Sequence, residues 1–85
     1  ETAVVETPYD QVVTFPNPTQ GDLSIRGLSG DHRIQIIDPL GAVYLDRWIR
    51  GDWTLEMGGW PAGMYYLLLE DASGEHRYIQ PIFKQ

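Results

Sequence analysis

Cysteine is absent from the 85-residue sequence, which excludes disulfides and zinc sites built on thiolates. Long uninterrupted segments are also lacking, because 9 glycines and 6 prolines are spread along the chain. The longest segment free of both runs for ten residues, from Met64 to Ser73, and a typical helix needs about 11–12 residues. The longest apolar run, Met64 to Leu69, is far shorter than the roughly 20 residues of a transmembrane helix. The sequence therefore disfavours helix bundles, coiled coils and membrane-spanning helices.

Basic residues are few, since six Lys and Arg face twelve Asp and Glu and the net charge is −6. Without a basic patch, we expect no binding to nucleic acid. A basic amphipathic helix that could lie on an anionic membrane is also absent. The hydrophobic fraction of 42% is too high for a disordered chain, so the sequence predicts one small folded domain.

Seven short segments predict β-strands, because apolar and polar residues alternate along most of them and turn-forming residues separate them. Strands of this length and spacing are typical of an all-β sandwich of about seven short antiparallel strands. We expect residues 1–10 to form a linker or a first strand and residues 11–85 to form the domain. The predicted strands cover residues 11–15, 22–26, 33–38, 42–46, 52–57, 64–70 and 76–84.

The alternating positions predict which side chains fill the core. We also expect large aromatic side chains to contribute strongly, because a domain of this size buries only about 60–65% of its unfolded surface. The aromatic candidates are Trp48, Trp53, Trp60, Tyr65, Tyr66 and Phe83. The alternating core positions are Leu23, Ile25, Ile34, Ile36, Val43, Leu45, Leu55, Tyr65, Leu67 and Leu69.

Local patterns define a hairpin and an edge strand. The sequence Asp38-Pro39-Leu40-Gly41 matches a type I turn, so residues 33–46 should form a β-hairpin. The segment Met64 to Glu70 is apolar on both faces and predicts a central strand. Pro81 cannot donate a hydrogen bond to a neighbouring strand, so the last strand should lie at a sheet edge or carry a bulge, with backbone groups left unpaired.

Three segments together resemble one known family. The first is Phe15-Pro16-Asn17-Pro18-Thr19-Gln20-Gly21, followed by the alternating residues Leu23-Ser24-Ile25. The second is the apolar hairpin Ile36 to Val43, with an Asp and a Gly three residues apart, and the third is Trp60-Pro61-Ala62-Gly63-Met64-Tyr65-Tyr66-Leu67. In this order and spacing, they resemble the C-terminal sorting domain of the type IX secretion system.

The resemblance implies an immunoglobulin-like β-sandwich that addresses an N-terminal cargo of the same chain to an outer-membrane translocon of a Gram-negative cell. It implies a shuttle protein of the outer membrane and a sortase as further partners. The cargo would be in the periplasm in transit, and then at the outer membrane and cell surface or secreted. An exposed strand edge adds the possibility of an edge-paired or domain-swapped dimer.

Motif residues and the last strand supply the candidates for recognition. A structural role stays open for them, since Pro16-Asn17-Pro18 would also make a rigid turn and Gly63 and Tyr65 would also serve core packing. The candidates are Pro16, Asn17, Pro18, Gly21, Asp38, Gly41, Pro61, Gly63, Tyr65, Ile82, Phe83 and Lys84.

Other chemistry has little support in the sequence. His32 and His76 stand beside charged residues and are interpreted as solvated surface residues rather than metal ligands. No catalytic triad, phosphate loop or zinc signature is present, so we expect neither an enzyme nor a cofactor. Trp48, Trp53 and Trp60 suggest an alternative, a small carbohydrate-binding module with an aromatic platform. Alternation with Leu55 favours the core for Trp53, whereas Trp48 stands next to Arg47 and Ile49. An adhesive immunoglobulin-like module is a second alternative.

Overall fold

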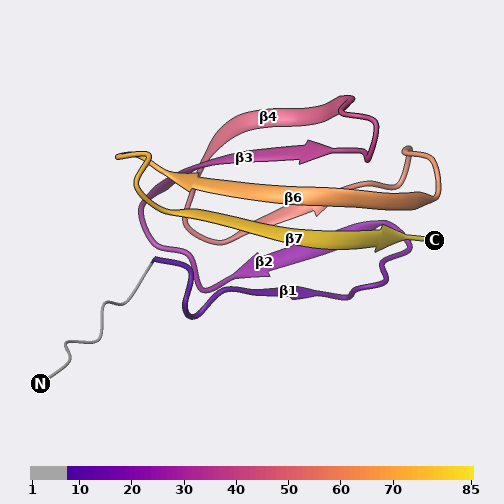
Figure 1. The fold of residues 1–85 in the computed structure, drawn as a ribbon. Coiled ribbons are helices and arrows are strands. Elements are labelled where there is room, and N and C mark those ends of the chain that lie inside the picture. The colour runs from indigo at the N-terminus through magenta and orange to yellow at the C-terminus, as the bar shows by residue number, and fades with distance from the viewer. Residues whose placement is uncertain (1–7) are drawn as a thin grey trace, which may run out of the picture.

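The computed structural model describes residues 8–85, which form seven antiparallel β-strands and no helix (Figure 1). None of these residues therefore lies in a helix that could cross a membrane. The predicted all-β class and strand number are confirmed. The strands are β1 (Val13–Phe15), β2 (Asp22–Arg26), β3 (Asp31–Ile37), β4 (Val43–Arg50), β5 (Trp53–Glu56), β6 (Gly63–Asp71) and β7 (Arg77–Lys84).

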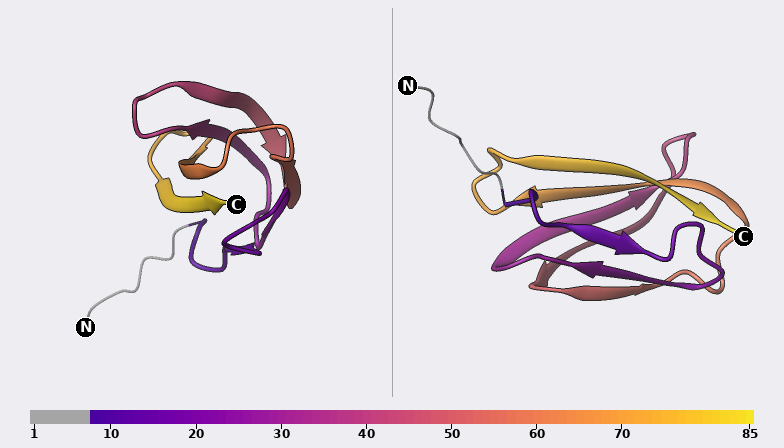
Figure 2. Two further views of the ribbon diagram at one scale, coloured as in Figure 1. Left: turned by 90° about the vertical axis from the view of Figure 1, so that its right-hand side faces the viewer. Right: turned by 90° about the horizontal axis from the view of Figure 1, so that it is seen from below.

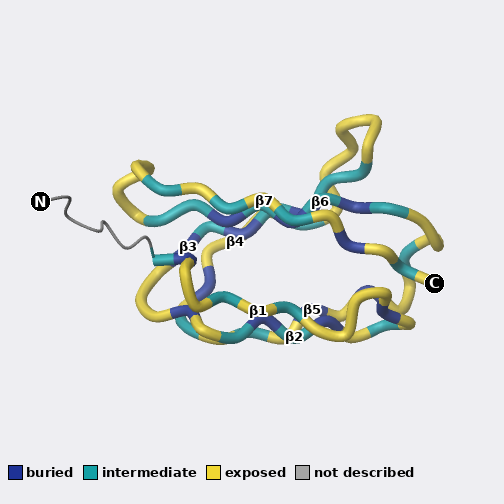
Figure 3. The backbone as a smooth tube through the Cα atoms, turned by 60° about the horizontal axis from the view of Figure 1, so that its bottom comes forward, coloured by how far each residue is buried: buried dark blue, intermediate teal, exposed yellow. Residues whose placement is uncertain are grey.

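The strands form two layers that face each other across the core (Figures 2 and 3). One sheet has the order β1-β2-β5, and the other has the order β4-β3-β6-β7. Strand β6 lies between β3 and β7, as its apolar character on both faces predicts. Strand β7 lies at an edge, which confirms the position inferred from Pro81.

Aliphatic side chains from both sheets fill the core, because alternate residues of each strand point toward the opposite layer. Eight of the ten predicted core positions are buried, and Leu45 is partly buried against them. Met57 and Ile82 are fully buried as well. The buried predicted residues are Leu23, Ile25, Ile34, Ile36, Leu55, Tyr65, Leu67 and Leu69.

The prediction for Val43 is wrong, since this side chain is 57% exposed. The hairpin register shifts between Ile36, which pairs with Leu45, and Ile37, which pairs with Val43. This β-bulge adds one residue to β4, and a shift of one residue moves a side chain to the other face of a sheet. Val43 therefore lies opposite Ile37 on the outer face, although Leu45 still points inward.

The expected aromatic core is also largely wrong. Of the six aromatic candidates only Tyr65 is buried, whereas Trp48 and Phe83 are 54% and 47% exposed. Trp53 and Trp60 are partly buried and pack against the rim of the core. The space between the two sheets is only about 10 Å wide, and interlocking Leu and Ile side chains already occupy it.

The interpretation of His32 as a solvated residue is wrong. Strand β3 begins at Asp31, two residues earlier than predicted, so the alternation that buries Ile34 also turns His32 inward. Its side chain is 3% exposed. One ring nitrogen, Nδ1, lies 3.0 Å from the Tyr9 hydroxyl, and the other, Nε2, lies 2.8 Å from the Ser29 carbonyl oxygen.

Several predicted boundaries differ from those in the structure. Residues 1–7 of the expected linker or first strand lie outside the described residues, and residues 8–10 form a turn in which Tyr9 is buried. Strand β1 is shorter than predicted. The hairpin extends over residues 31–50 rather than 33–46, so Trp48 lies within β4.

Alanine substitution of one inward and one outward side chain of the hairpin tests the bulged register. Ile36→Ala should reduce the free energy of unfolding by about 2–5 kcal/mol, because it leaves a cavity at a fully buried site. Val43→Ala should cost less than about 1 kcal/mol, because Val43 faces solvent. Denaturant unfolding of both variants measures this difference, and equal losses would contradict the bulged register.

Candidate recognition site

The three sequence motifs and the last residues of β7 meet at one end of the sandwich, which we call the motif end. The turn after β1, the β3–β4 turn, the loop before β6 and the end of β7 all lie at the right of Figure 1. Figure 2 (left) looks onto this end. Strand pairing explains the meeting, since Gly63 is opposite Lys84 and Tyr65 is opposite Ile82. All twelve candidate residues therefore belong to one region.

Asn17 joins the first motif to the last strand. Its side-chain amide donates a hydrogen bond to the Pro81 carbonyl oxygen at 3.0 Å, and its side-chain oxygen accepts one from the Phe83 N–H at 3.0 Å. The Asn17 side chain thus takes the place of a neighbouring strand beside β7. The Phe15–Pro16 and Asn17–Pro18 peptide bonds are both cis.

Thr19 continues this contact with its backbone. Its N–H donates to the Phe83 carbonyl oxygen at 2.8 Å, and its own carbonyl oxygen accepts from the Gln85 N–H at 2.8 Å, as in a short parallel bridge. The buried Thr19 hydroxyl donates to the Asp22 carbonyl oxygen at 2.6 Å and accepts from the Gly21 N–H at 3.1 Å. Thr19 belongs to the first motif but is not among the recognition candidates, although a Thr before a turn is typical of such local hydrogen bonds.

These bonds correct the expectation that the edge of β7 is left unpaired. Pro81, Phe83 and Gln85 already give their outward backbone groups to the turn of residues 16–20. The part of the β7 edge that this turn covers begins at Pro81. Arg77 and Ile79 lie before it on the same strand. A natural edge strand covered in this way is protected against unwanted pairing with another chain.

The β3–β4 turn is held by the carboxylate of Asp38. Its Oδ1 accepts from the N–H groups of Leu40 and Ala42, each at 2.9 Å. The Gly41 N–H donates to the Asp38 carbonyl oxygen at 3.0 Å, as expected for the predicted β-turn. Gly41 has a φ of +91°, which a residue with a Cβ rarely adopts. These two motif residues therefore have a structural role in shaping the turn.

The third motif anchors the start of β6. The Tyr65 hydroxyl donates to the Pro61 carbonyl oxygen at 2.5 Å, and burial raises the pKa of this hydroxyl. The Tyr65 ring packs edge-on against Tyr44 at 5.1 Å between centroids and lies 5.6 Å from the ring of Trp60. Tyr65 is therefore a core residue whose hydroxyl reaches a polar partner, as expected.

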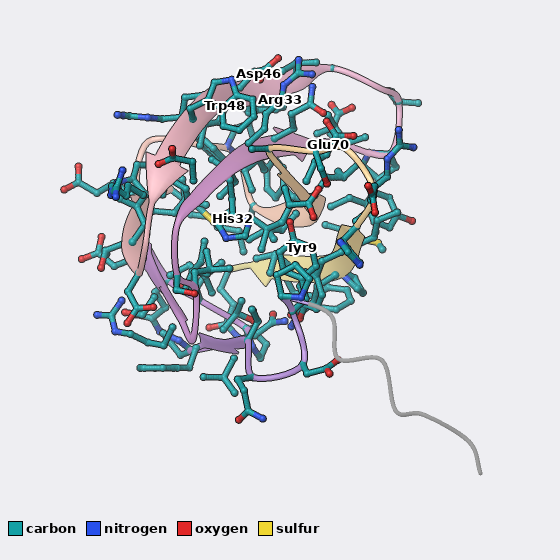
Figure 4. The ribbon with its side chains drawn as sticks, turned by 90° about the vertical axis from the view of Figure 1, so that its left-hand side faces the viewer. Tyr9, His32, Arg33, Asp46, Trp48 and Glu70 are labelled. Carbon is teal, nitrogen blue, oxygen red and sulfur yellow. The ribbon has the colours of Figure 1, made fainter. Side chains whose placement is uncertain are left out.

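The opposite end of the sandwich holds buried and paired polar groups. Figure 4 looks onto this end and shows Tyr9 and His32 inside it, with Arg33, Asp46, Trp48 and Glu70 around the four-stranded sheet. His76 is paired with Asp71, and the distance from Nδ1 to Oδ2 is 2.7 Å. Among residues 8–85, no three His, Asp or Glu side chains gather at a distance suited to a metal ion.

Comparison with known proteins gives a family match and a structural match. Residues 13–82 match the family described as secretion system C-terminal sorting domain. Three chains of solved structures match, and one is PorZ, an essential bacterial surface component of the type-IX secretion system of Porphyromonas gingivalis. That match has a TM-score of 0.70 and 16% sequence identity, and covers 92% of this chain but 12% of the PorZ chain. The comparison with curated proteins gave no match.

The bridge made by Asn17 predicts a specific effect on the last strand. Asn17→Ala should speed hydrogen exchange at the Phe83 amide and lower the free energy of unfolding by about 1–2 kcal/mol, because two hydrogen bonds are lost. Asn17→Asp keeps the acceptor for the Phe83 N–H, so it should retain most of this protection at neutral pH. Amide exchange followed by NMR measures both effects. Unchanged Phe83 exchange in the alanine variant would contradict the bridge.

The pair of Asp71 and His76 predicts a pH dependence. Hydrogen bonds from the His76 ring, the Ser73 hydroxyl and the His76 N–H lower the pKa of Asp71 to about 2. An unfolded Asp has a pKa of about 3.9, so the ionised carboxylate stabilises the fold above about pH 4. This contribution is lost as the pH falls from about 4 to about 2.

Asp71→Asn has no carboxylate to titrate, so its stability should fall less than that of the unmodified domain over this pH range. Thermal melting between pH 2 and pH 5 provides the measurement. Parallel melting curves for the two proteins would show that Asp71 does not carry this pH dependence.

Proposed function

The chain belongs to the family of secretion system C-terminal sorting domains, and from this membership we propose that it acts as a docking module and not as an enzyme. It is a sorting signal of the type IX secretion system, which carries the attached protein across the outer membrane of Gram-negative bacteria. The observation that supports docking is the meeting of all three motifs with the end of β7. At the motif end, exposed side chains from segments that are far apart in the sequence form one surface.

The partners that we propose are the translocon, a shuttle protein of the outer membrane and a sortase. The turn of residues 16–20 and the end of β7 would be recognised together, because hydrogen bonds join them into one unit. A partner that adds a strand beside Pro81 and Phe83 has to displace Asn17 and Thr19. A partner that binds the exposed side chains of Pro16, Pro18 and Phe83 leaves these bonds intact. We favour the second mode.

The position of Tyr9 supports this arrangement. Tyr9 packs against His32 and Tyr78, with ring centroids 5.3 and 5.7 Å apart, at the end of the sandwich opposite the motif end (Figure 4). A cargo that precedes Tyr9 would leave the motif end accessible in the periplasm. We further propose that the sortase cuts before Tyr9, in the segment that joins cargo and domain, so that the cargo reaches the cell surface or the medium.

The competing carbohydrate-binding function depends on Trp48. Its ring is 54% exposed on β4, opposite Arg33. The other two tryptophans are partly buried against the core, so Trp48 would have to act as a single platform. The adhesive alternative has no particular residue in its support. The meeting of the motifs favours the sorting function over both.

A short deletion tests the role of the last residues. Removing Phe83, Lys84 and Gln85 should cost about 1–4 kcal/mol of stability, because bonds to Asn17 and Thr19 and part of the Phe83 contacts are lost. A reporter fused to the shortened domain should still fold and should stay in the periplasm of a cell that has the type IX system. Thermal melting checks folding, and cell fractionation measures export.

Asn17→Ala provides the control for this deletion, because it weakens the same contact and keeps the last three residues. The reporter with Asn17→Ala should still be exported. Delivery of the shortened fusion to the surface would contradict the signal role of these residues. Loss of export in both variants would show that the two Thr19 backbone bonds are not enough to hold the turn and β7 together and that the Asn17 bonds are required for recognition.

A further inference from the structure

The outer faces of the two sheets differ in chemistry. In the three-stranded sheet, the outward residues of β2 and β5 are polar, among them Asp22, Ser24, Thr54 and Glu56. Its exposed apolar side chains, Val13 and Phe15, are confined to the edge strand β1. In the four-stranded sheet, cross-strand neighbours bring apolar side chains together. These are Val43, Ile37, Tyr66, Leu68, Ile79 and Phe83, which we call the apolar face.

Strand register makes the apolar face continuous. Val43 lies opposite Ile37, Ile37 opposite Tyr66, and Leu68 opposite Ile79. The bulge that turns Val43 outward extends the face onto β4. Val43 and Ile79, on the two edge strands, are 57% and 62% exposed. The largest apolar patch on a typical monomer spans about 300–600 Å² and often has a function.

A depression of 270 Å³ adjoins the apolar face. It is lined by Leu68 and Ile79 and by the charged residues Arg33, Glu70 and Arg77. The charges compensate one another within the domain, since Arg33 binds Asp46 at 2.7 Å and Arg77 binds Glu70 at 3.0 Å. Because each charged side chain that lines the depression in residues 8–85 has a partner of opposite charge, the depression suits an apolar side chain of a partner better than an ion.

We propose that the apolar face is a docking surface for a protein of the secretion machinery that presents an apolar patch. This inference rests on the proposed function and names a second contact for the same partner. Phe83 belongs both to the apolar face and to the motif end, so the two surfaces are continuous. A partner at the motif end reaches the apolar face without a second binding event.

The size and charge of the face disfavour other occupants. Strand spacing and rise give it an area of about 300 Å², whereas a stable dimer buries about 800 Å² per partner. Two copies with a net charge of −6 each also repel one another. A small contact fits a partner that must release the domain after delivery.

The test compares matched double variants of the two outer faces. Val43→Lys with Ile79→Lys changes one exposed residue on each edge strand of the four-stranded sheet. Val13→Lys with Thr54→Lys does the same on the three-stranded sheet and adds the same charge. Both should fold, because exposed lysine is well tolerated on edge strands. Thermal melting of the purified domains confirms this before export is measured.

Export of a fused reporter to the cell surface is the readout. The V43K/I79K variant should lower the export rate about tenfold, which corresponds to a contact weakened by about 1.4 kcal/mol, while V13K/T54K should export as the unmodified fusion does. Equal export of both variants, or equal loss in both, would overturn the proposal and leave the sorting function in place. An unmodified fusion that is not exported would overturn the sorting function and this proposal with it.

Sedimentation of the purified domain tests the second-copy alternative. We expect a monomer at micromolar concentration. A dimer that V43K/I79K dissociates and V13K/T54K does not would overturn the assignment to a machinery partner.

Discussion

Two residues of one turn, Asn17 and Thr19, hold the end of β7 in place. Together they make four hydrogen bonds to Pro81, Phe83 and Gln85, which follow them by more than sixty residues in the chain. Without these bonds, the described part of β7 would be hydrogen-bonded only to β6, and core contacts such as those of Ile82 would have to hold the two sheets together at the motif end. The closed edge has two consequences. It keeps the last strand from pairing with other chains, and it combines the first and last sequence motifs into one surface.

The two ends of the sandwich serve different purposes. Around Tyr9 and His32, the structure buries polar groups and satisfies them internally, which suits a place where the chain enters the domain. At the motif end, the turns are fixed by local bonds such as those of Asp38, and exposed side chains remain available. A rigid scaffold with accessible loops at one end is a common arrangement for binding. The apolar face beside Phe83 extends that accessible region along the four-stranded sheet.

Most of the fold follows from short patterns in the sequence. Alternation located the strands, the apolar character of Met64–Leu69 on both faces located the central strand, and Pro81 placed the last strand at an edge. Two errors in side-chain burial arose where alternation was broken or where a strand began earlier than its pattern indicated. The bulge in the hairpin turned Val43 outward, and the early start of β3 buried His32. Neither a bulge nor the first residue of a strand is marked by composition, because both depend on how the neighbouring strand pairs.

By itself, the sequence determined the all-β class, the strand order along the chain, most of the aliphatic core and the resemblance to a sorting domain. These properties depend on local periodicity and on motifs whose residues are close together in the chain. Only the tertiary structure decided that Asn17 binds β7, that the three motifs share one end and that six apolar side chains form a patch on the outer face of the four-stranded sheet. Such contacts join residues far apart in the chain, and their partners are chosen by strand register and sheet packing. A short segment of sequence, taken alone, does not specify which distant residue it will contact.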